Sequence, residues 1–250
     1  IWEQIDGIWS CLVLAAVVLA LRNRLTGSLL CLVLALNTKL QAIIFLPPLL
    51  LLWLPIGLAG PKRRLAEAAL AAVALQVALL LPFLLGPDPN ALRRIAQINL
   101  ESSGFFPYIS MMAYNVWMLL MHKDALLGTS DELIKLGLSY RQWGLLAFMG
   151  SAAVALLPLL GLMLGQLRRR QTWQAADYPP VLLTLGLVPV LFCYFNTEMH
   201  ERYWHPCVVL LGAYALCSGR FWLYGMASLA YLCNLEAVLH YWAWFERPPN

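Results

Sequence analysis

Charged residues are scarce in this sequence. Asp, Glu, Lys and Arg make up 12% of the 250 residues, whereas a soluble domain carries roughly 25%. The charges are also segregated, and long runs hold none. This composition excludes an ordinary soluble domain and predicts a polytopic membrane protein. The net charge of +4 requires no nucleic-acid partner, because Lys and Arg cluster in short loops, as topology signals do.

The sequence also lacks the common signatures of metal, nucleotide and nucleophile chemistry. Its six cysteines show no CxxC or other metal-type spacing, so we interpret them as small buried hydrophobic residues. Walker, GxGxxG, nucleophile-elbow and HExxH motifs are absent. The chain begins at Ile1 with a polar cluster directly before an apolar run, so we expect further helices upstream of Ile1.

Apolar runs predict an all-α fold, a polytopic transmembrane helical bundle of about eight membrane segments in a single domain over residues 1–250. Pro47 and Pro48 fall inside the third run, which predicts a bent or broken helix there. The eight runs are Ile8–Leu21, Leu25–Leu36, Leu40–Leu58, Leu65–Leu85, Gly144–Gly165, Val181–Tyr194, Cys207–Ser218 and Phe221–Trp242.

The longest polar region, residues 86–143, predicts an outer-face loop with short interfacial helices. Within it, Phe105–Met121 is apolar and aromatic but short for a span, so we predict an interfacial or re-entrant helix. We also predict a short amphipathic helix over the segment Asp131–Tyr140.

Short basic loops set the expected orientation. If Arg22 and Arg24 lie in the cytoplasm, alternation through the eight segments places three further basic loops there. These four loops hold nine of the seventeen basic residues. The same alternation places residues 86–143 and every unusual polar cluster on the opposite, outer face.

Two polar clusters lie in the first fifth of the chain. Glu3 and Asp6 are three residues apart on one helical face, where they could bind a sugar, a metal or an acceptor amine. The alternative is a solvated helix N-terminus, at which acids complement the helix dipole. Lys39, in Asn37–Gln41, suits an anionic ligand, and the alternative is a snorkelling lysine in a tight helical hairpin.

Two further clusters follow later in the chain. The first is the stretch Phe195–Pro206, which lies between two apolar runs. Ionisable residues at the end of an apolar segment are functional candidates, and the guanidinium of Arg202 can bind a phosphate. His200 can donate to a phosphate or act as an acid or base, while Glu201 can orient either neighbour. The alternative is an internally satisfied ion-pair cluster. The aromatic stretch Phe105–Trp117 suits carbohydrate faces or an interfacial aromatic belt, but Asn115 is not explained by such a belt.

Taken in order, these four stretches resemble motifs of the GT-C membrane glycosyltransferases, which use polyprenyl-phosphate sugars on the outer or lumenal face. The likeness is to the dolichyl-phosphate-glucose glucosyltransferases of N-glycan precursor synthesis and to their bacterial and archaeal relatives. The matching stretches are Trp2–Asp6, Asn37–Gln41 with Pro47, Phe105–Tyr108 with Asn115 and Trp117, and His200–Arg202.

The resemblance implies an inverting transfer of a hexose from a polyprenyl-phosphate donor to a lipid-linked or other extracytoplasmic acceptor. It implies that Lys39, Arg202 and His200 bind the donor phosphate, and that His200 and Glu201 assist catalysis. The family's base is an acid in an earlier outer loop, so we expect the base upstream of Ile1.

The resemblance also implies the remaining ligands. Glu3, Gln4, Asp6, Gln41 and Asn115 are the expected sugar or acceptor contacts, and Asp6 is not promoted to the role of base. Neither a metal nor a cofactor is expected, because in this family the leaving group is a polyprenyl monophosphate and not a diphosphate that a metal must neutralise. The expected partners are membrane lipid, the lipid-linked sugar donor and a glycan or lipid-linked acceptor, with no nucleic acid.

Two other function classes remain open. One is a transporter or flippase for a lipid-linked substrate, although such proteins carry charges near the midplane. The other is a non-catalytic membrane scaffold. We expect a multi-pass protein of a prokaryotic plasma membrane, in preference to the endoplasmic reticulum, with its active face extracytoplasmic.

Overall fold

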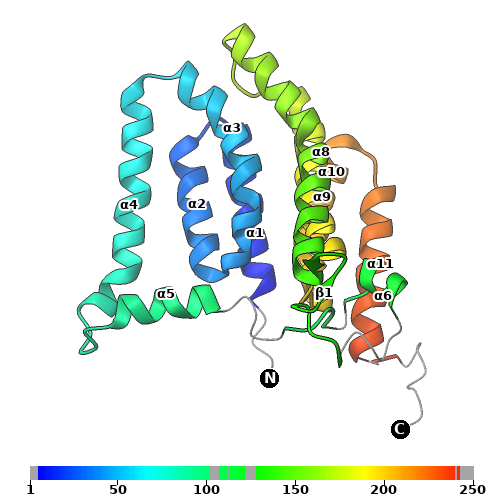
Figure 1. The fold of residues 1–250 in the computed structure, drawn as a ribbon. Helices are drawn as coiled ribbons and strands as arrows, with labels where there is room; N and C mark the ends of the chain where they lie inside the picture. The colour runs from blue at the N-terminus through cyan, green and yellow to red at the C-terminus, as the bar shows by residue number, and fades with distance from the viewer. Residues whose placement is uncertain (1–4, 102–106, 112, 122–127, 240, 243–250) are drawn as a thin grey trace. The chain divides into compact units, whose positions relative to one another are not determined.

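The structure is a computed structural model that describes residues 5–101, 107–111, 113–121, 128–239 and 241–242. It is almost entirely helical, as predicted (Figure 1). The helices form two compact units. Unit 1 comprises Ile1–Phe105 and Leu157–Val181, and unit 2 comprises Phe106–Leu156 and Leu182–Asn250.

Each of the eight apolar runs forms a helix. Four helical segments are long and apolar enough to cross a membrane, namely Leu40–Ala59, Lys62–Leu84, Tyr140–Arg169 and Ala175–Phe195. In the part of the chain that the structure describes, the other four runs form helices that do not meet those limits of length and hydropathy. The helices are α1 (Asp6–Leu21), α2 (Leu25–Thr38), α3 (Leu46–Ala59), α4 (Lys62–Leu84), α8 (Tyr140–Arg169), α9 (Tyr178–Phe195), α10 (His205–Ser218) and α11 (Trp222–Leu239).

The predicted break in the third run is confirmed. A 3₁₀ helix, η1 (Leu40–Phe45), precedes α3, and Pro47 and Pro48 stand in the first turn of α3. Proline is tolerated in a first turn, because the N–H that it lacks would have no partner within the helix. The two prolines therefore determine where the α-helix begins.

Unit 1 is built on the antiparallel pair α1 and α2. Asn23 closes the turn between them with a φ of +57°, in the left-handed region that asparagine tolerates. Ser28 donates to the carbonyl of Ala16 at 2.7 Å, and the indole of Trp53 donates to the Ser28 hydroxyl at 2.8 Å. These bonds satisfy the buried polar atoms that join α1, α2 and α3.

The loop between α8 and α9 is part of the core of unit 1. Trp173 is 2% exposed, and its indole donates to the carbonyl of Leu52 at 2.7 Å. Asn23 exchanges two hydrogen bonds of 3.2 Å with the backbone of Trp173. The loop therefore joins the turn that holds Arg22 and Arg24, at one end of unit 1. The 3₁₀ helix η2 (Ala175–Asp177) follows.

The outer-loop region differs from its prediction in three ways. An unpredicted amphipathic helix, α5 (Ala91–Glu101), follows α4 and lies across its end in Figure 1. The interfacial helix expected over Phe105–Met121 is wrong for the described residues, because helix α6 covers only Val116–Leu120. Tyr108 and Met111 instead form β-bridges.

The third difference is the segment Asp131–Tyr140, for which the predicted helix is wrong. Strands β1 (Ile134–Lys135) and β2 (Leu138–Ser139) form an antiparallel hairpin there. Leu136 and Gly137 both have positive φ, +54° and +86°. A two-residue turn with positive φ at both positions matches the right-handed twist of a hairpin.

Trp173 provides a test of how the loop is docked. We expect Trp173→Ala to lower the free energy of unfolding by roughly 3–5 kcal/mol, because a buried indole and its hydrogen bond are lost. Thermal unfolding in detergent measures this loss. Trp222→Ala is the control, since Trp222 is 61% exposed. Equal melting temperatures for the two variants would contradict the docked loop.

Candidate functional site

The fold brings the four polar stretches together two by two. Within unit 1, Asp6 contacts Lys39, which joins the first stretch to the second. Within unit 2, the segment Pro107–Met111 pairs with Glu198–His200, which joins the third to the fourth. These pairs form the Asp6–Lys39 cluster and the His200–Arg202 cluster.

The Asp6–Lys39 cluster is centred on one buried carboxylate. Asp6, the first residue of α1, is 5% exposed. Its Oδ1 accepts from Lys39 Nζ at 2.5 Å and from the indole of Trp9 at 3.1 Å. Lys39 Nζ also lies 6.0 Å from the centre of the Trp9 ring, within cation–π range. Asp6 is thus the counter-ion of Lys39, so an anionic ligand at Lys39 would meet this carboxylate.

The other residues predicted in unit 1 differ in their surroundings. Gln41 lies in η1, and its buried Oε1 accepts no hydrogen bond from the described residues. Asn37 exchanges hydrogen bonds of 2.7 and 3.1 Å with Gln76 and so connects α2 to α4. Glu3 and Gln4 lie outside the described residues. Gln41 therefore has hydrogen-bonding capacity to offer a ligand.

In unit 2, three chain segments run side by side next to the end of α9. The N–H of Glu198 donates to the carbonyl of Tyr108, and the N–H of Met111 donates to the carbonyl of Met199, each at 3.1 Å. On its other side, Tyr108 bridges to Ser130. Backbone hydrogen bonds therefore hold the start of the His200–Arg202 cluster.

The carboxylate of Glu201 lies between the guanidinium of Arg202 and the imidazole of His200. Glu201 is 6% exposed and begins the 3₁₀ helix η3 (Glu201–Trp204). Its Oε1 is 3.5 Å from Arg202 Nη1, and its Oε2 is 3.9 Å from His200 Nδ1. The side chains of His200 and Arg202 are each 20% exposed. Arg202 also lies 5.8 Å from the centre of the Tyr203 ring. The arrangement suits a partly accessible anion site whose Arg202 and His200 donors share one fixed carboxylate.

Asn115, a predicted sugar contact, serves the fold. Its Oδ1 accepts from the N–H of Trp117 at 3.2 Å and caps α6, while its Nδ2 donates to the carbonyl of Asn196 at 3.3 Å. The indole of Trp117 donates to the carbonyl of Phe195 at 2.9 Å. The last carbonyls of a helix lack partners within it, so this loop completes the end of α9.

Sequence analysis missed the ion-pair network that connects the hairpin to this loop. Asp131 is fully buried and accepts from Arg141 at 3.0 and 3.3 Å and from the hydroxyl of Thr197 at 2.7 Å. Arg141 also forms an ion pair with Glu198. The backbone of Glu198 has a φ of +59°, which is uncommon for a residue other than glycine. The network fixes the residues that immediately precede His200.

Asn234 of α11 is a second residue that sequence analysis missed. It is 5% exposed, donates to the carbonyl of Glu201 at 3.1 Å, and accepts from the N–H of Tyr114 at 3.1 Å. An amide inside an apolar helix is the sequence signal that could have revealed it. Nearby, the carboxylate of Glu236 accepts from the N–H groups of Tyr241 and Trp242, just beyond the end of α11.

Comparison with known proteins leaves the family of the chain open. No family model matches it, and neither a curated protein nor a solved structure matches it. The residues of the two clusters are therefore the basis for a functional proposal.

The Asp131 network yields a second prediction. We expect Asp131→Ala to lower the free energy of unfolding by roughly 2–3 kcal/mol, less than for a fully buried pair because the Arg141 side chain is 37% exposed. Asp88→Ala is a matched control, since its partner Arg94 is 68% exposed, and we expect almost no loss there. Equal losses in thermal unfolding would show that the network does not hold this loop.

Proposed function

We propose that the protein is an integral-membrane glycosyltransferase with eight membrane segments. It moves a hexose from a polyprenyl-phosphate donor to a lipid-linked or other extracytoplasmic acceptor. The observation that carries the proposal is the buried carboxylate of Glu201. It lies between α9 and α10, within ion-pair range of both His200 and Arg202. Such a cluster provides a fixed cation, Arg202, and a second hydrogen-bond donor, His200, next to an apolar helix, as a lipid phosphate requires.

The chemistry follows from the charge that develops on the leaving group. When the bond between the sugar and the phosphate breaks, negative charge builds on the phosphate. A cation held in place before the reaction lowers that barrier without reorganisation. Arg202 offers a planar set of donors to the phosphate oxygens, and His200 offers a further donor. Glu201 acts as a positioning residue, because its carboxylate limits the movement of both.

The placement of charge favours this activity over transport. The described charged side chains of the long helices lie within about two turns of a helix end, as Lys62, Glu67, Arg141, Arg168 and Glu236 do. Transporters hold their substrates with discontinuous helices near the midplane. Charges at helix ends suit a reaction at the membrane surface.

The proposal gives Lys39 a narrower role than the sequence suggested. Because Asp6 neutralises it, Lys39 is proposed as a ligand for a donor or acceptor group that can share the carboxylate, such as a sugar hydroxyl. Gln41, with its buried Oε1, is proposed to contact the same ligand. A single displacement inverts the anomeric centre, and no residue of this chain is assigned as the base that activates the acceptor.

Donor binding tests the proposal. The protein, expressed from its complete gene, is titrated in detergent with a radiolabelled polyprenyl-phosphate hexose. We expect Arg202→Ala to weaken binding by about tenfold to a hundredfold, because a charge-assisted bond contributes roughly 1.5–3 kcal/mol. Glu201→Gln is expected to weaken binding less than Arg202→Ala does, because Arg202 keeps its charge.

Arg94→Ala is the control for charge, because Arg94 lies on α5 and pairs with Asp88. Polyprenyl phosphate without a sugar should compete with the donor for the wild-type protein. If Arg202→Ala and Arg94→Ala bind the donor as tightly as the wild type, the His200–Arg202 cluster is structural, and the proposal is wrong.

A further inference from the structure

An apolar groove in unit 1 lies at the opposite end of α2 from the Asp6–Lys39 cluster. It has a volume of about 440 Å³ and lies between α2, α3 and α4, with Leu25, Leu29, Trp53, Leu54 and Leu65 among its walls. Sites for small ligands typically occupy about 300–1,000 Å³. The groove is therefore large enough for a ligand.

The lining of the groove selects an apolar ligand. The one polar side-chain atom among the lining residues, the indole nitrogen of Trp53, already donates to Ser28. Leu54 and Leu65 are 43% and 41% exposed, so the groove opens to its surroundings. Gly57 allows Leu65 of α4 to lie close to the backbone of α3, because a Cβ at position 57 would be 2.7 Å from Leu65 Cδ2. A flexible hydrocarbon chain fits such a space.

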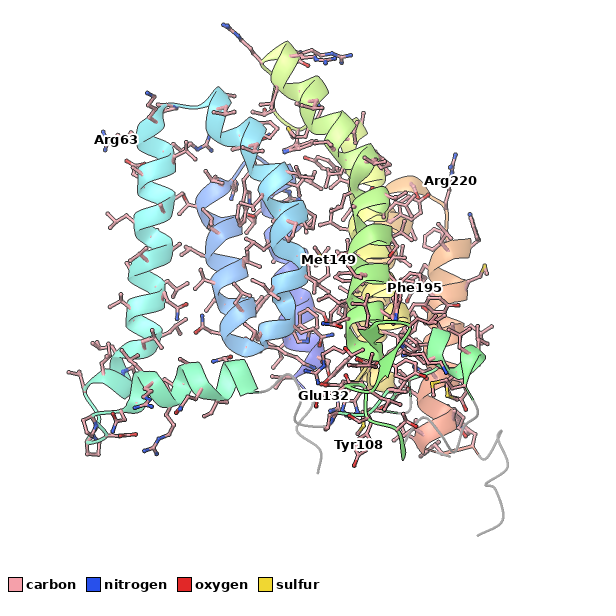
Figure 2. The ribbon with its side chains drawn as sticks, in the orientation of Figure 1. Arg63, Tyr108, Glu132, Met149, Phe195 and Arg220 are labelled. Carbon is pink, nitrogen blue, oxygen red and sulfur yellow. The ribbon has the colours of Figure 1, made fainter. Side chains whose placement is uncertain are left out.

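Basic residues surround one end of the groove. Leu25 follows Arg24, and Leu65 follows Lys62, Arg63 and Arg64. The guanidinium of Arg64 reaches from the start of α4 to the carbonyl of Asn23 at 2.7 Å, which places it one residue from Arg24. Arg63, labelled at this end of α4 in Figure 2, pairs with Glu67.

The charge balance of this rim is strongly positive. Residues 22–25 and 60–69 contain five basic residues and one acidic residue, Glu67. Glu67 is already paired with Arg63, whereas Arg24, Lys62 and Arg64 are exposed. Basic residues at the end of a membrane helix attract anionic lipid headgroups.

We infer that this groove is a binding site for an acidic diacyl glycerophospholipid. One acyl chain lies along Leu25, Leu54 and Leu65, and the headgroup phosphate contacts Arg24 and Arg64. The inference rests on the membrane embedding of the protein and is independent of glycosyl transfer. The lipid joins α4, which is exposed along most of its length, to α2 and α3.

Lipid binding is tested with nitroxide-labelled phosphatidylglycerol and phosphatidylcholine of identical chains. The protein in nonionic detergent is titrated with each lipid, and the immobilised fraction is measured by electron paramagnetic resonance. We expect phosphatidylglycerol to bind at least fivefold more tightly. Each of Arg24→Gln and Arg64→Gln should reduce that preference by about fivefold, whereas Arg94→Gln on α5 should leave it unchanged.

A second pair of variants tests the acyl-chain site. Leu54→Trp fills the groove and should abolish binding of both lipids, while Leu229→Trp, on the exposed surface of α11, should not. Melting temperatures establish that the variants are folded, and Leu58→Trp replaces Leu54→Trp if the latter unfolds. Equal binding of the two lipids, or retained binding in the filled groove, would overturn the inference. Displacement by polyprenyl phosphate at lower concentrations than by phosphatidylglycerol would also overturn it, because the groove would then belong to the sugar donor.

Discussion

The cost of removing a charge from water governs where this protein keeps its polar groups. An ionised side chain in the middle of an apolar helix costs several kcal/mol, and a buried one needs an opposite charge or hydrogen bonds. Asp6, Asp131 and Glu201 are all buried next to helix ends, and each has a cationic neighbour. The same constraint leaves the centres of the long helices apolar. Helix ends are therefore the places where this chain can bind polar ligands.

The two clusters meet this constraint differently. Lys39 and Asp6 neutralise each other at 2.5 Å, with Trp9 alongside. In the His200–Arg202 cluster, Glu201 lies at longer range from the Arg202 guanidinium and the His200 imidazole, which are both partly exposed. The supporting residues also differ, because Asp131 accepts from the Thr197 hydroxyl just before the second cluster, and Asn234 donates to the carbonyl of Glu201 within it. This difference is why the proposed phosphate site is placed at His200 and Arg202 rather than at Lys39.

The helices could be predicted from the sequence because an apolar run needs only local composition, and Pro47 identified the break before α3. Local patterns failed in the polar loop. Leu92, Ile95 and Ile98 recur at helical spacing in α5, but the region was interpreted by its overall polarity. The hairpin depends on one glycine after Leu136, a weak turn signal. The contact between Arg141 and Glu198 joins residues 57 apart in sequence, and no local pattern predicts such a pair.

The proposed topology places the polar clusters on one side of the membrane, and cysteine labelling tests this sidedness. In Figure 2, Tyr108 and Glu132 lie at one end of unit 2, and Arg220 lies at the other. Single cysteines replace Glu132, Arg63 and Arg220 in a variant without the native cysteines, and a membrane-impermeant maleimide is added to right-side-out vesicles. With this topology, we expect that only the cysteine at position 132 reacts before the vesicles are permeabilised. Reaction of the cysteines at 132 and 220 from the same side would contradict it.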